Sequence, residues 1–178
     1  MKYIVILFIL FPFINAYAKD NIVIYRMDAK DQTVWSAIKK SFDNKGYNVS
    51  IYEKTDNMDR HLENLNMINR ANALLALVID LKVSDKSNVF IATSEAEKGK
   101  GRFLAIDEVA AHHSENSMKL AKEVATSFGK NSKRFAIFPL LGVDMPGIFI
   151  NIDCQNDNIN EILNKLHESI QKYLKRGI

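Results

Sequence analysis

The sequence predicts an α/β protein, a single three-layer domain in which helices cover both faces of a mostly parallel sheet. Short apolar runs alternate with segments whose apolar residues recur at helical spacing. The run ALLALVIDL at 73–81 is apolar at both odd and even positions. That pattern is typical of a central parallel strand covered on both faces. The length of 178 residues fits one domain.

The first half of the chain predicts two strand–helix pairs. Strand 22–24 precedes a helix over 34–42, which ends before Gly46. In YNVSIYE the apolar residues alternate with polar ones, as in a second strand. In residues 62–68, apolar side chains recur every three residues, which predicts a second helix that ends near 71–72. The apolar helical positions are Val34, Trp35, Ile38 and Phe42, then Leu62, Leu65 and Ile68.

The second half continues the alternation after the central run. The residues that mark its helices are Leu120, Val124 and Phe128, then Ile159, Ile162, Leu163, Leu166, Ile170 and Tyr173. The predicted elements are, in order, strand 73–81, strand 88–93, a charged glycine-bearing loop at 95–103, a helix near 120–128, strand 147–152 and a long helix near 159–173.

The first 18 residues resemble a secretory signal peptide. Lys2 is followed by an almost continuous apolar run over 3–14 and by an A-x-A cleavage pattern at 16–18. The run is too short to span a bilayer comfortably, and no cysteine follows it for lipid attachment. The expected mature chain is 19–178, which has no stable membrane span and is periplasmic or secreted in a bacterium. The alternative is an uncleaved membrane anchor.

Composition excludes some classes of protein. The formal net charge of +3 and the absence of a basic run argue against a nucleic-acid partner. Cys154 is the only cysteine, so the fold has no internal disulfide. A lone cysteine without a nearby histidine or other cation is expected to be a small buried apolar residue.

Two polar residues, Asp80 and Asn151, follow apolar strand-like runs. Ligands of open parallel sheets bind beyond the carboxyl ends of the strands. We therefore expect both side chains at one edge of the sheet, in a crevice, with residues 74–79 among the most buried of the chain.

The order of motifs resembles that of the zinc-dependent N-acetylmuramoyl-L-alanine amidases that cut peptidoglycan (amidase-3 type). The similarity covers most of 19–178 and is weak at each position. Asp56 matches an aspartate of that family. The segments that resemble it are AIKKSFDNKGYNVSIYEKTDN (37–57), HLENLNMINRANALLALVIDLKV (61–83), SMKLAKEVATSF (117–128) and PLLGVDMPGIFINIDCQND (139–157).

The resemblance implies an amidase-like fold and an ancestral zinc site. In that family two histidines and a glutamate hold zinc, and a further glutamate is the general base. This chain departs from all four: it has no histidine at 25–32 and no glutamate before Trp35, Asp80 replaces the second histidine, and Asn151 replaces the catalytic glutamate. Zinc catalysis needs about three protein ligands and an open position. An amide has no basic site at neutral pH, so Asn151 cannot accept a proton from water.

Other residues could rebuild a metal site. Asp28, Asp31 and Asp80 would suit magnesium, calcium or manganese better than zinc, although aspartates before a helix are more often caps. His112 and His113 are adjacent, so on a helix they diverge by roughly 100° and are expected to be surface residues.

The remaining candidate residues are expected to lie at the surface. Among polar neighbours on helices, His61 and His167 are expected to be solvated. Lys98, Lys100 and Arg102 could meet acidic stem peptides, but a solvated loop is the preferred interpretation.

The favoured function is that of an exported, catalytically inactive amidase-like protein. It would bind peptidoglycan fragments or an envelope partner through a crevice that includes Asp28, Asp80 and Asn151, with no catalytic residue, no metal ligand and no cofactor. One alternative is an active amidase with rearranged metal ligands. Another is a structural envelope-assembly protein.

Overall fold

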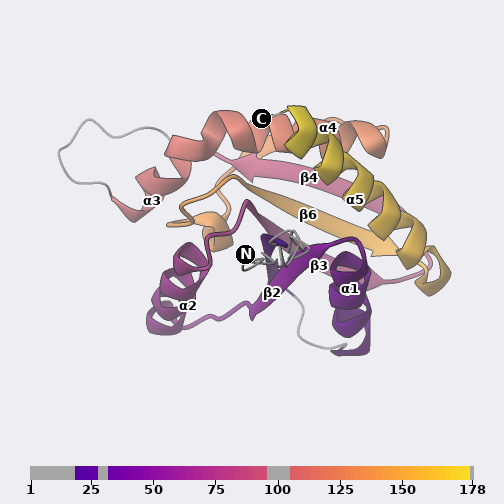
Figure 1. The fold of residues 1–178 in the computed structure, drawn as a ribbon, viewed down its shortest axis with the longest axis horizontal. Coiled ribbons are helices and arrows are strands. Elements are labelled where there is room, and N and C mark those ends of the chain that lie inside the picture. Colours follow the sequence, from indigo (N-terminus) through magenta and orange to yellow (C-terminus); the bar gives the residue numbers. More distant parts are fainter. Residues whose placement is uncertain (1–18, 28–31, 96–104, 177–178) are drawn as a thin grey trace, which may run out of the picture.

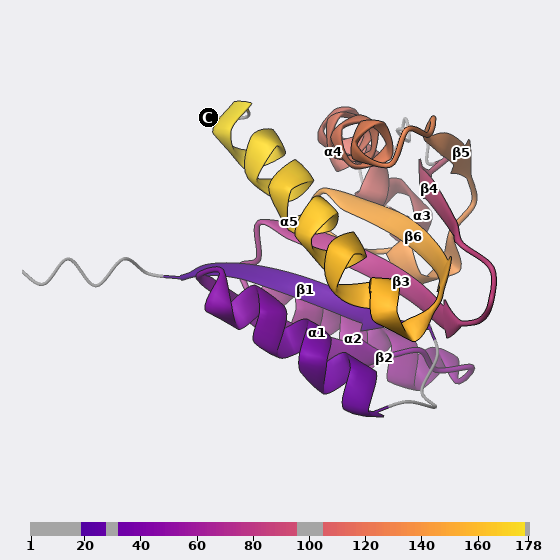
Figure 2. The same ribbon diagram turned by 90° about the vertical axis from the view of Figure 1, so that its right-hand side faces the viewer.

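A six-stranded sheet crosses the middle of the protein, and helices lie against both of its faces (Figure 1 and Figure 2). The structure is a computed structural model that describes residues 19–27, 32–95 and 105–176. Neighbouring strands follow the order β2-β1-β3-β6-β4-β5. All neighbouring pairs are parallel except β4 and β6, which are antiparallel. The predicted α/β class with a mostly parallel sheet is confirmed.

The described elements alternate as the sequence predicts. They are β1 (Asp20–Arg26), α1 (Gln32–Asn44), β2 (Tyr47–Glu53), α2 (Met58–Arg70), β3 (Leu75–Val83), β4 (Asn88–Ser94), α3 (Ile106–Val109), η1 (Ala110–His113), α4 (Ser114–Ser127), β5 (Lys133–Phe135), η2 (Phe138–Leu140), β6 (Gly147–Cys154), η3 (Asn156–Asn158) and α5 (Ile159–Arg176).

The central strand β3 is buried on both faces over 75–79, as its unbroken apolar run predicts. It lies between β1 and β6 and is parallel to both. Leu74 is an exception to the expected burial. It precedes the strand and is 39% exposed.

Two apolar clusters hold helices to the sheet. On one face, odd-numbered residues of β3 such as Leu77 pack with residues of α1, α4 and α5. On the other face, even-numbered residues such as Val78 pack with α2 and with residues of the 137–145 segment between β5 and β6. This is the three-layer arrangement that the sequence predicts, because alternate strand residues point to opposite faces.

The buried stripe of α2 differs from the predicted one. The buried residues are His61, Leu65 and Ile68, spaced i, i+4 and i+7, whereas Leu62 is 41% exposed. A spacing of three throughout drifts around a helix with 3.6 residues per turn. The prediction that Leu62 marks the core face was therefore wrong.

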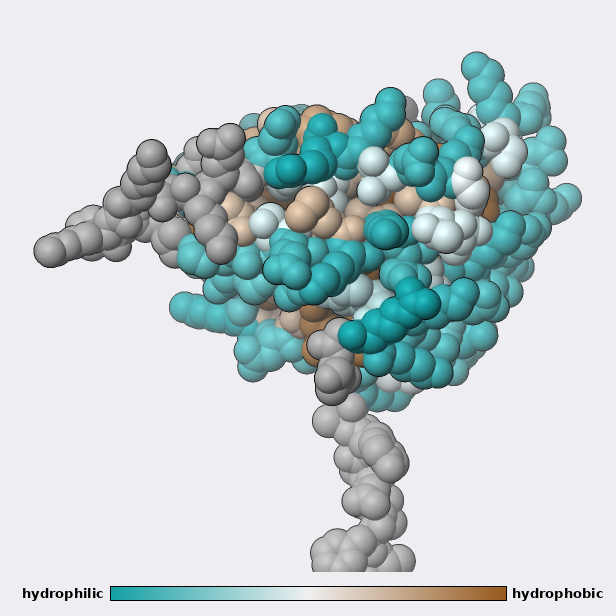
Figure 3. All heavy atoms as spheres, turned by 90° about the horizontal axis from the view of Figure 1, so that it is seen from above, coloured by the Kyte–Doolittle hydropathy of each residue, from teal (hydrophilic) through white to brown (hydrophobic). Residues whose placement is uncertain are grey.

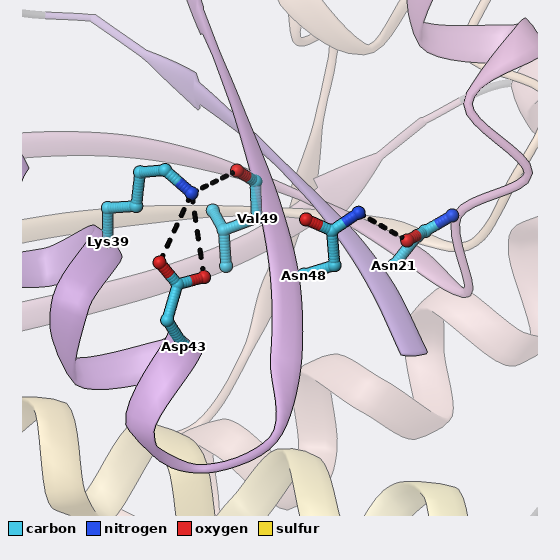
Figure 4. A network of polar contacts seen from close by, with 5 residues as sticks. All are labelled: Asn21, Lys39, Asp43, Asn48 and Val49. Carbon is cyan, nitrogen blue, oxygen red and sulfur yellow. Dashed lines mark hydrogen bonds and ion pairs between the residues drawn. The ribbon is translucent and has the colours of Figure 1, made fainter. Parts of the chain in front are cut away.

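Polar contacts fix the edge strand β2 beside α1 and β1 (Figure 4). Lys39 Nζ lies 3.2 Å from Asp43 Oδ2 and donates to the carbonyl oxygen of Val49 at 3.0 Å. At the amino end of the strands, Asn48 Nδ2 donates to Asn21 Oδ1 at 2.8 Å. Seen from above, the surface is mostly hydrophilic, with small apolar areas between polar side chains (Figure 3).

Candidate functional site

Asp80 and Asn151 lie side by side on neighbouring strands. The register of β3 and β6 makes them direct partners, and Asn151 Nδ2 donates to Asp80 Oδ2 at 3.1 Å. Both side chains are half-buried. They occupy the face of the sheet that α2 and the 137–145 segment also occupy, because Ala76 and Val78 precede Asp80 at even positions. The expected proximity of the two residues is confirmed.

Neither residue ends its strand. Beyond this pair, β3 and β6 continue together for three more residues, to Val83 and Cys154. The neighbouring β1 ends earlier, at Arg26, which pairs with Ile79. Asp80 and Asn151 thus lie just past the end of β1 and within the longer β3–β6 pair. The sequence predicted strand ends at these positions because polar residues interrupt the apolar runs there.

The chemistry of the pair fixes the orientation of the amide. An ionised carboxylate only accepts hydrogen bonds, so the NH2 group of Asn151 faces Asp80. Asn151 Oδ1 is left as the acceptor that the amide can offer to a ligand. The pair therefore presents carboxylate and amide oxygens, which suit a ligand with N–H or O–H donors.

Aromatic rings continue the surface beside this pair. Phe90 of β4 is the register partner of Asn151. Its ring stacks on Phe135 with centroids 5.8 Å apart, and Phe149 meets both rings edge-on. Lys133 Nζ lies 5.6 Å from the Phe90 ring centroid. The sequence did not indicate this cluster, because the strand β5 that carries Phe135 has three exposed residues and no alternating pattern.

Two hollows occur near the carboxyl ends of β1 and β2. One is lined by residues of the α1 side, among them Arg26, Gln32 and Trp35. The other lies between the end of β2 and α2, with Tyr52 and Arg60 in its lining. Neither hollow includes Asp80 or Asn151 in its lining.

The donor set that the described residues place around the pair does not fit zinc. One carboxylate and one amide fall short of the roughly three protein ligands that zinc requires, and the amide nitrogen already points at the carboxylate. Among residues 19–27, 32–95 and 105–176, no group of three histidine, cysteine or acidic side chains is placed to hold a metal ion. Asp28, Asp31, Lys98, Lys100 and Arg102 lie outside the described residues.

The expectation that His61 and His167 are solvated was wrong. His61 is 1% exposed and His167 is 7% exposed. Burial lowers the pKa of both imidazoles; the carbonyl of Leu141 partly opposes the shift at His61, and nearby Lys45 adds to the shift at His167. Each histidine shares a buried helical stripe with apolar residues. The i+4 spacing from His61 to Leu65 was the signal that could have identified the first one.

The adjacent histidines diverge as expected. His112 is exposed, while His113 is partly buried and its Nε2 lies 3.0 Å from Asp144 Oδ1.

Cys154 is buried, as expected for a small apolar residue. Burial raises the pKa of its thiol, and Asp153 adds to the effect. A thiol with a raised pKa holds less of the reactive thiolate at neutral pH.

Comparison with known proteins identifies the fold. No protein-family model and no curated protein matches the chain significantly. Among solved structures, the amidase Ami1 of Mycobacterium smegmatis is similar with a TM-score of 0.59 and 9% identity, over 89% of this chain and 98% of that one. The N-acetylmuramoyl-L-alanine amidase of Clostridium difficile 630 has a TM-score of 0.55 and 12% identity over the same shares. AmiC2 of Nostoc punctiforme has a TM-score of 0.51 and 13% identity, again over 89% of this chain and 98% of that one.

At these identities the similarity shows the fold alone, and it confirms the amidase-like architecture that the sequence motifs imply. Within the described part of the chain, no helix is both long and apolar enough to cross a bilayer.

Proposed function

We propose that this chain is an exported cell-envelope protein that binds peptidoglycan fragments on an amidase fold without cutting them. The observation that carries the proposal is the bond from Asn151 to Asp80. The two residues are register partners, and the sequence resemblance matches Asn151 to the catalytic glutamate and Asp80 to the second zinc-binding histidine of the amidases. A general base must accept a proton, and here an amide hydrogen-bonded to a carboxylate stands in its place.

The surface beside the pair supports a ligand of this kind. Carboxylate and amide oxygens can accept from the N–H groups of an acetamido sugar or of a stem peptide. The half-buried rings of Phe90 and Phe149 lie next to these acceptors. Apolar rings beside a few fixed polar groups are the usual composition of small-ligand sites.

A titration of the mature protein with a soluble muramoyl peptide, followed by calorimetry, tests the proposal. We expect wild-type protein to bind, and Asp80→Ala to weaken binding about 10- to 100-fold, because a hydrogen bond to a charged group contributes roughly 1.5–3 kcal/mol. Asn151→Ala should weaken binding less, since it removes a neutral acceptor.

The matched control is Asn48→Ala, which removes an amide hydrogen-bonded to Asn21 at the amino end of the strands. It should bind as wild type does. Wild-type protein that binds no muramoyl peptide, or an Asp80→Ala protein that binds as tightly as wild type while keeping its thermal unfolding midpoint, would overturn the proposal. Capture of an envelope protein in place of the muramoyl peptide would favour a scaffold role.

Export is part of the same proposal. The apolar run at 3–14 and the Ala16-Tyr17-Ala18 pattern support cleavage before Lys19. N-terminal sequencing of protein recovered from the periplasm or medium should give Lys19 as the first residue. Recovery of the chain with an intact Met1 from the soluble cytoplasm would contradict export.

A further inference from the structure

His61 is buried between two rings that belong to different layers. Its ring stacks on Phe138 with centroids 4.5 Å apart and meets Tyr25 edge-on at 6.2 Å. Nδ1 lies 3.5 Å from Tyr25 Oη. Nε2 is buried without a hydrogen-bond partner, and the backbone of Leu141 only partly offsets the effect of burial on the pKa of the ring. The imidazole therefore joins β1, α2 and the turn η2.

The 137–145 segment, which contains η2, lies against α2 through two kinds of contact. At its beginning, Phe138 stacks on His61. Towards its end, Asn69 Nδ2 donates to the carbonyl of Gly142, and Asn69 Oδ1 accepts from the backbone N–H of Asp144, both at 2.9 Å. The segment closes over the apolar cluster of this face, to which it contributes Ile137, Leu140, Val143 and Met145.

We propose that His61 is an acid-sensitive latch: the neutral imidazole holds the Phe138 end of the 137–145 segment on α2, and protonation releases that end. The proposal is independent of what the protein binds.

The surroundings of His61 favour the neutral ring. Tyr25 is the titratable side chain of the described residues that contacts it, and a phenol is uncharged at the pH values concerned. Phe138 offers only its ring face, and on α2 itself the neighbours that share the buried stripe are Leu65 and Ile68. Burial lowers the pKa of His61, and the Leu141 carbonyl offsets this only in part. No carboxylate of the described residues pairs with a charge placed here, so the protonated ring gains by moving into water.

The other end of the segment does not share this sensitivity. The contacts of Asn69 carry no titratable group. His113 Nε2 lies 3.0 Å from Asp144 Oδ1, and an Nε2–H can donate to that carboxylate from a neutral or a protonated ring. Acid should therefore open the segment from the Phe138 end and leave it attached near Asp144.

Two backbone amides report this opening directly. Within the turn, Leu140 N–H donates to the carbonyl of Ile137, and Leu141 N–H donates to that of Phe138, each at 3.0 Å. Hydrogen exchange of these amides, read on the mature protein and normalised to the intrinsic exchange rate at each pH, measures how often the turn opens.

We expect the protection of both amides to be constant near pH 7.5. Below about pH 6.5 it should fall by as much as about tenfold per pH unit until the lowered pKa of His61 is reached. The direction and the pH range of this loss follow from the lowered pKa of His61. The opened state binds the proton more readily than the closed state, so the closed state is lost as pH falls. The amide of Asp144 should keep its protection over the same range.

A pair of histidine variants makes the test specific. His61→Phe keeps a ring to stack on Phe138 and removes the titration, so the protection of the turn should become independent of pH. His167→Phe removes the other buried histidine, which lies on the opposite face beside Tyr47, and should retain the wild-type pH profile of the turn.

The inference is overturned if wild-type protection at the turn is unchanged between about pH 7.5 and pH 5, or if His61→Phe keeps the loss. Should His61→Phe not fold, the wild-type imidazole can be titrated by NMR. A His61 pKa at or above that of a free histidine would equally contradict the latch.

Discussion

The change Asn151→Glu, which restores the side chain that the resembling amidases use as a base, is expected not to create amidase activity. The new carboxylate would face Asp80 across the β3–β6 pair, where Asn151 Nδ2 now donates at 3.1 Å. A base alone contributes about 10²–10⁴ in rate, and it needs an activated water on which to act. Zinc requires about three protein ligands, and no group of three histidine, cysteine or acidic side chains is placed to hold a metal ion among the described residues. Muropeptide digests analysed by mass spectrometry should therefore match the protein-free control.

The thermal stability of the same variant should depend on pH, and this dependence distinguishes a folded but inactive protein from a misfolded one. Two adjacent carboxylates cannot both ionise easily, so the pKa of one of them should rise. When the pKa of a carboxyl group is higher in the folded state than in the unfolded state, the protein loses stability as pH rises through the folded-state pKa. The thermal unfolding midpoint of Asn151→Glu should therefore fall relative to that of Asn151→Gln at neutral pH and approach it in acid. An Asn151→Glu protein that folds and releases stem peptide would show that a metal site exists which includes residues beyond those described.

The largest stability effect is expected at the centre of the sheet. Leu77 is fully buried on β3, and its register partners Ile24 and Ile148 are fully buried as well. Truncation to alanine leaves a cavity that a central strand cannot close, since strands pack on both sides of it. Leu77→Ala should lower the free energy of unfolding by about 2–5 kcal/mol, measured by urea denaturation.

Leu62→Ala provides the matched control, because it is the same chemical change at a side chain that is 41% exposed. It should alter the free energy of unfolding by no more than about 0.5 kcal/mol. Equal losses at the two leucines would mean that α2 buries a different face from the one described.

The fold was predictable from the sequence where the apolar pattern was unambiguous. The run at 73–81 is apolar at both parities, and β3 is the buried central strand. The order of elements and the weakly similar motifs together implied an amidase-like fold, and structures only 9–13% identical share it. Three short features carried no such pattern. The strand β5 has three exposed residues, and α3 and η2 are a turn or less long.

The candidate site was predictable in part. The adjacency of Asp80 and Asn151 followed from parallel strands whose apolar runs end in register. The continuation of both strands was missed because Asp80 and Asn151 were taken as strand ends, although apolar and polar residues still alternate beyond them in Leu81-Lys82-Val83 and Ile152-Asp153-Cys154. The burial of His61 was missed for a different reason. A histidine can lie in a core stripe when its ring stacks on aromatic neighbours, here Tyr25 and Phe138, and those neighbours come from distant parts of the sequence.

Metal analysis and a muropeptide digest on one sample of the purified mature protein test the central claim most directly, which is that the amidase fold has been kept without its chemistry. The account predicts no stoichiometric zinc after incubation with the metal and no free stem peptide above the protein-free control. Zinc near one equivalent, or release of stem peptide that Asp80→Ala abolishes, would contradict it.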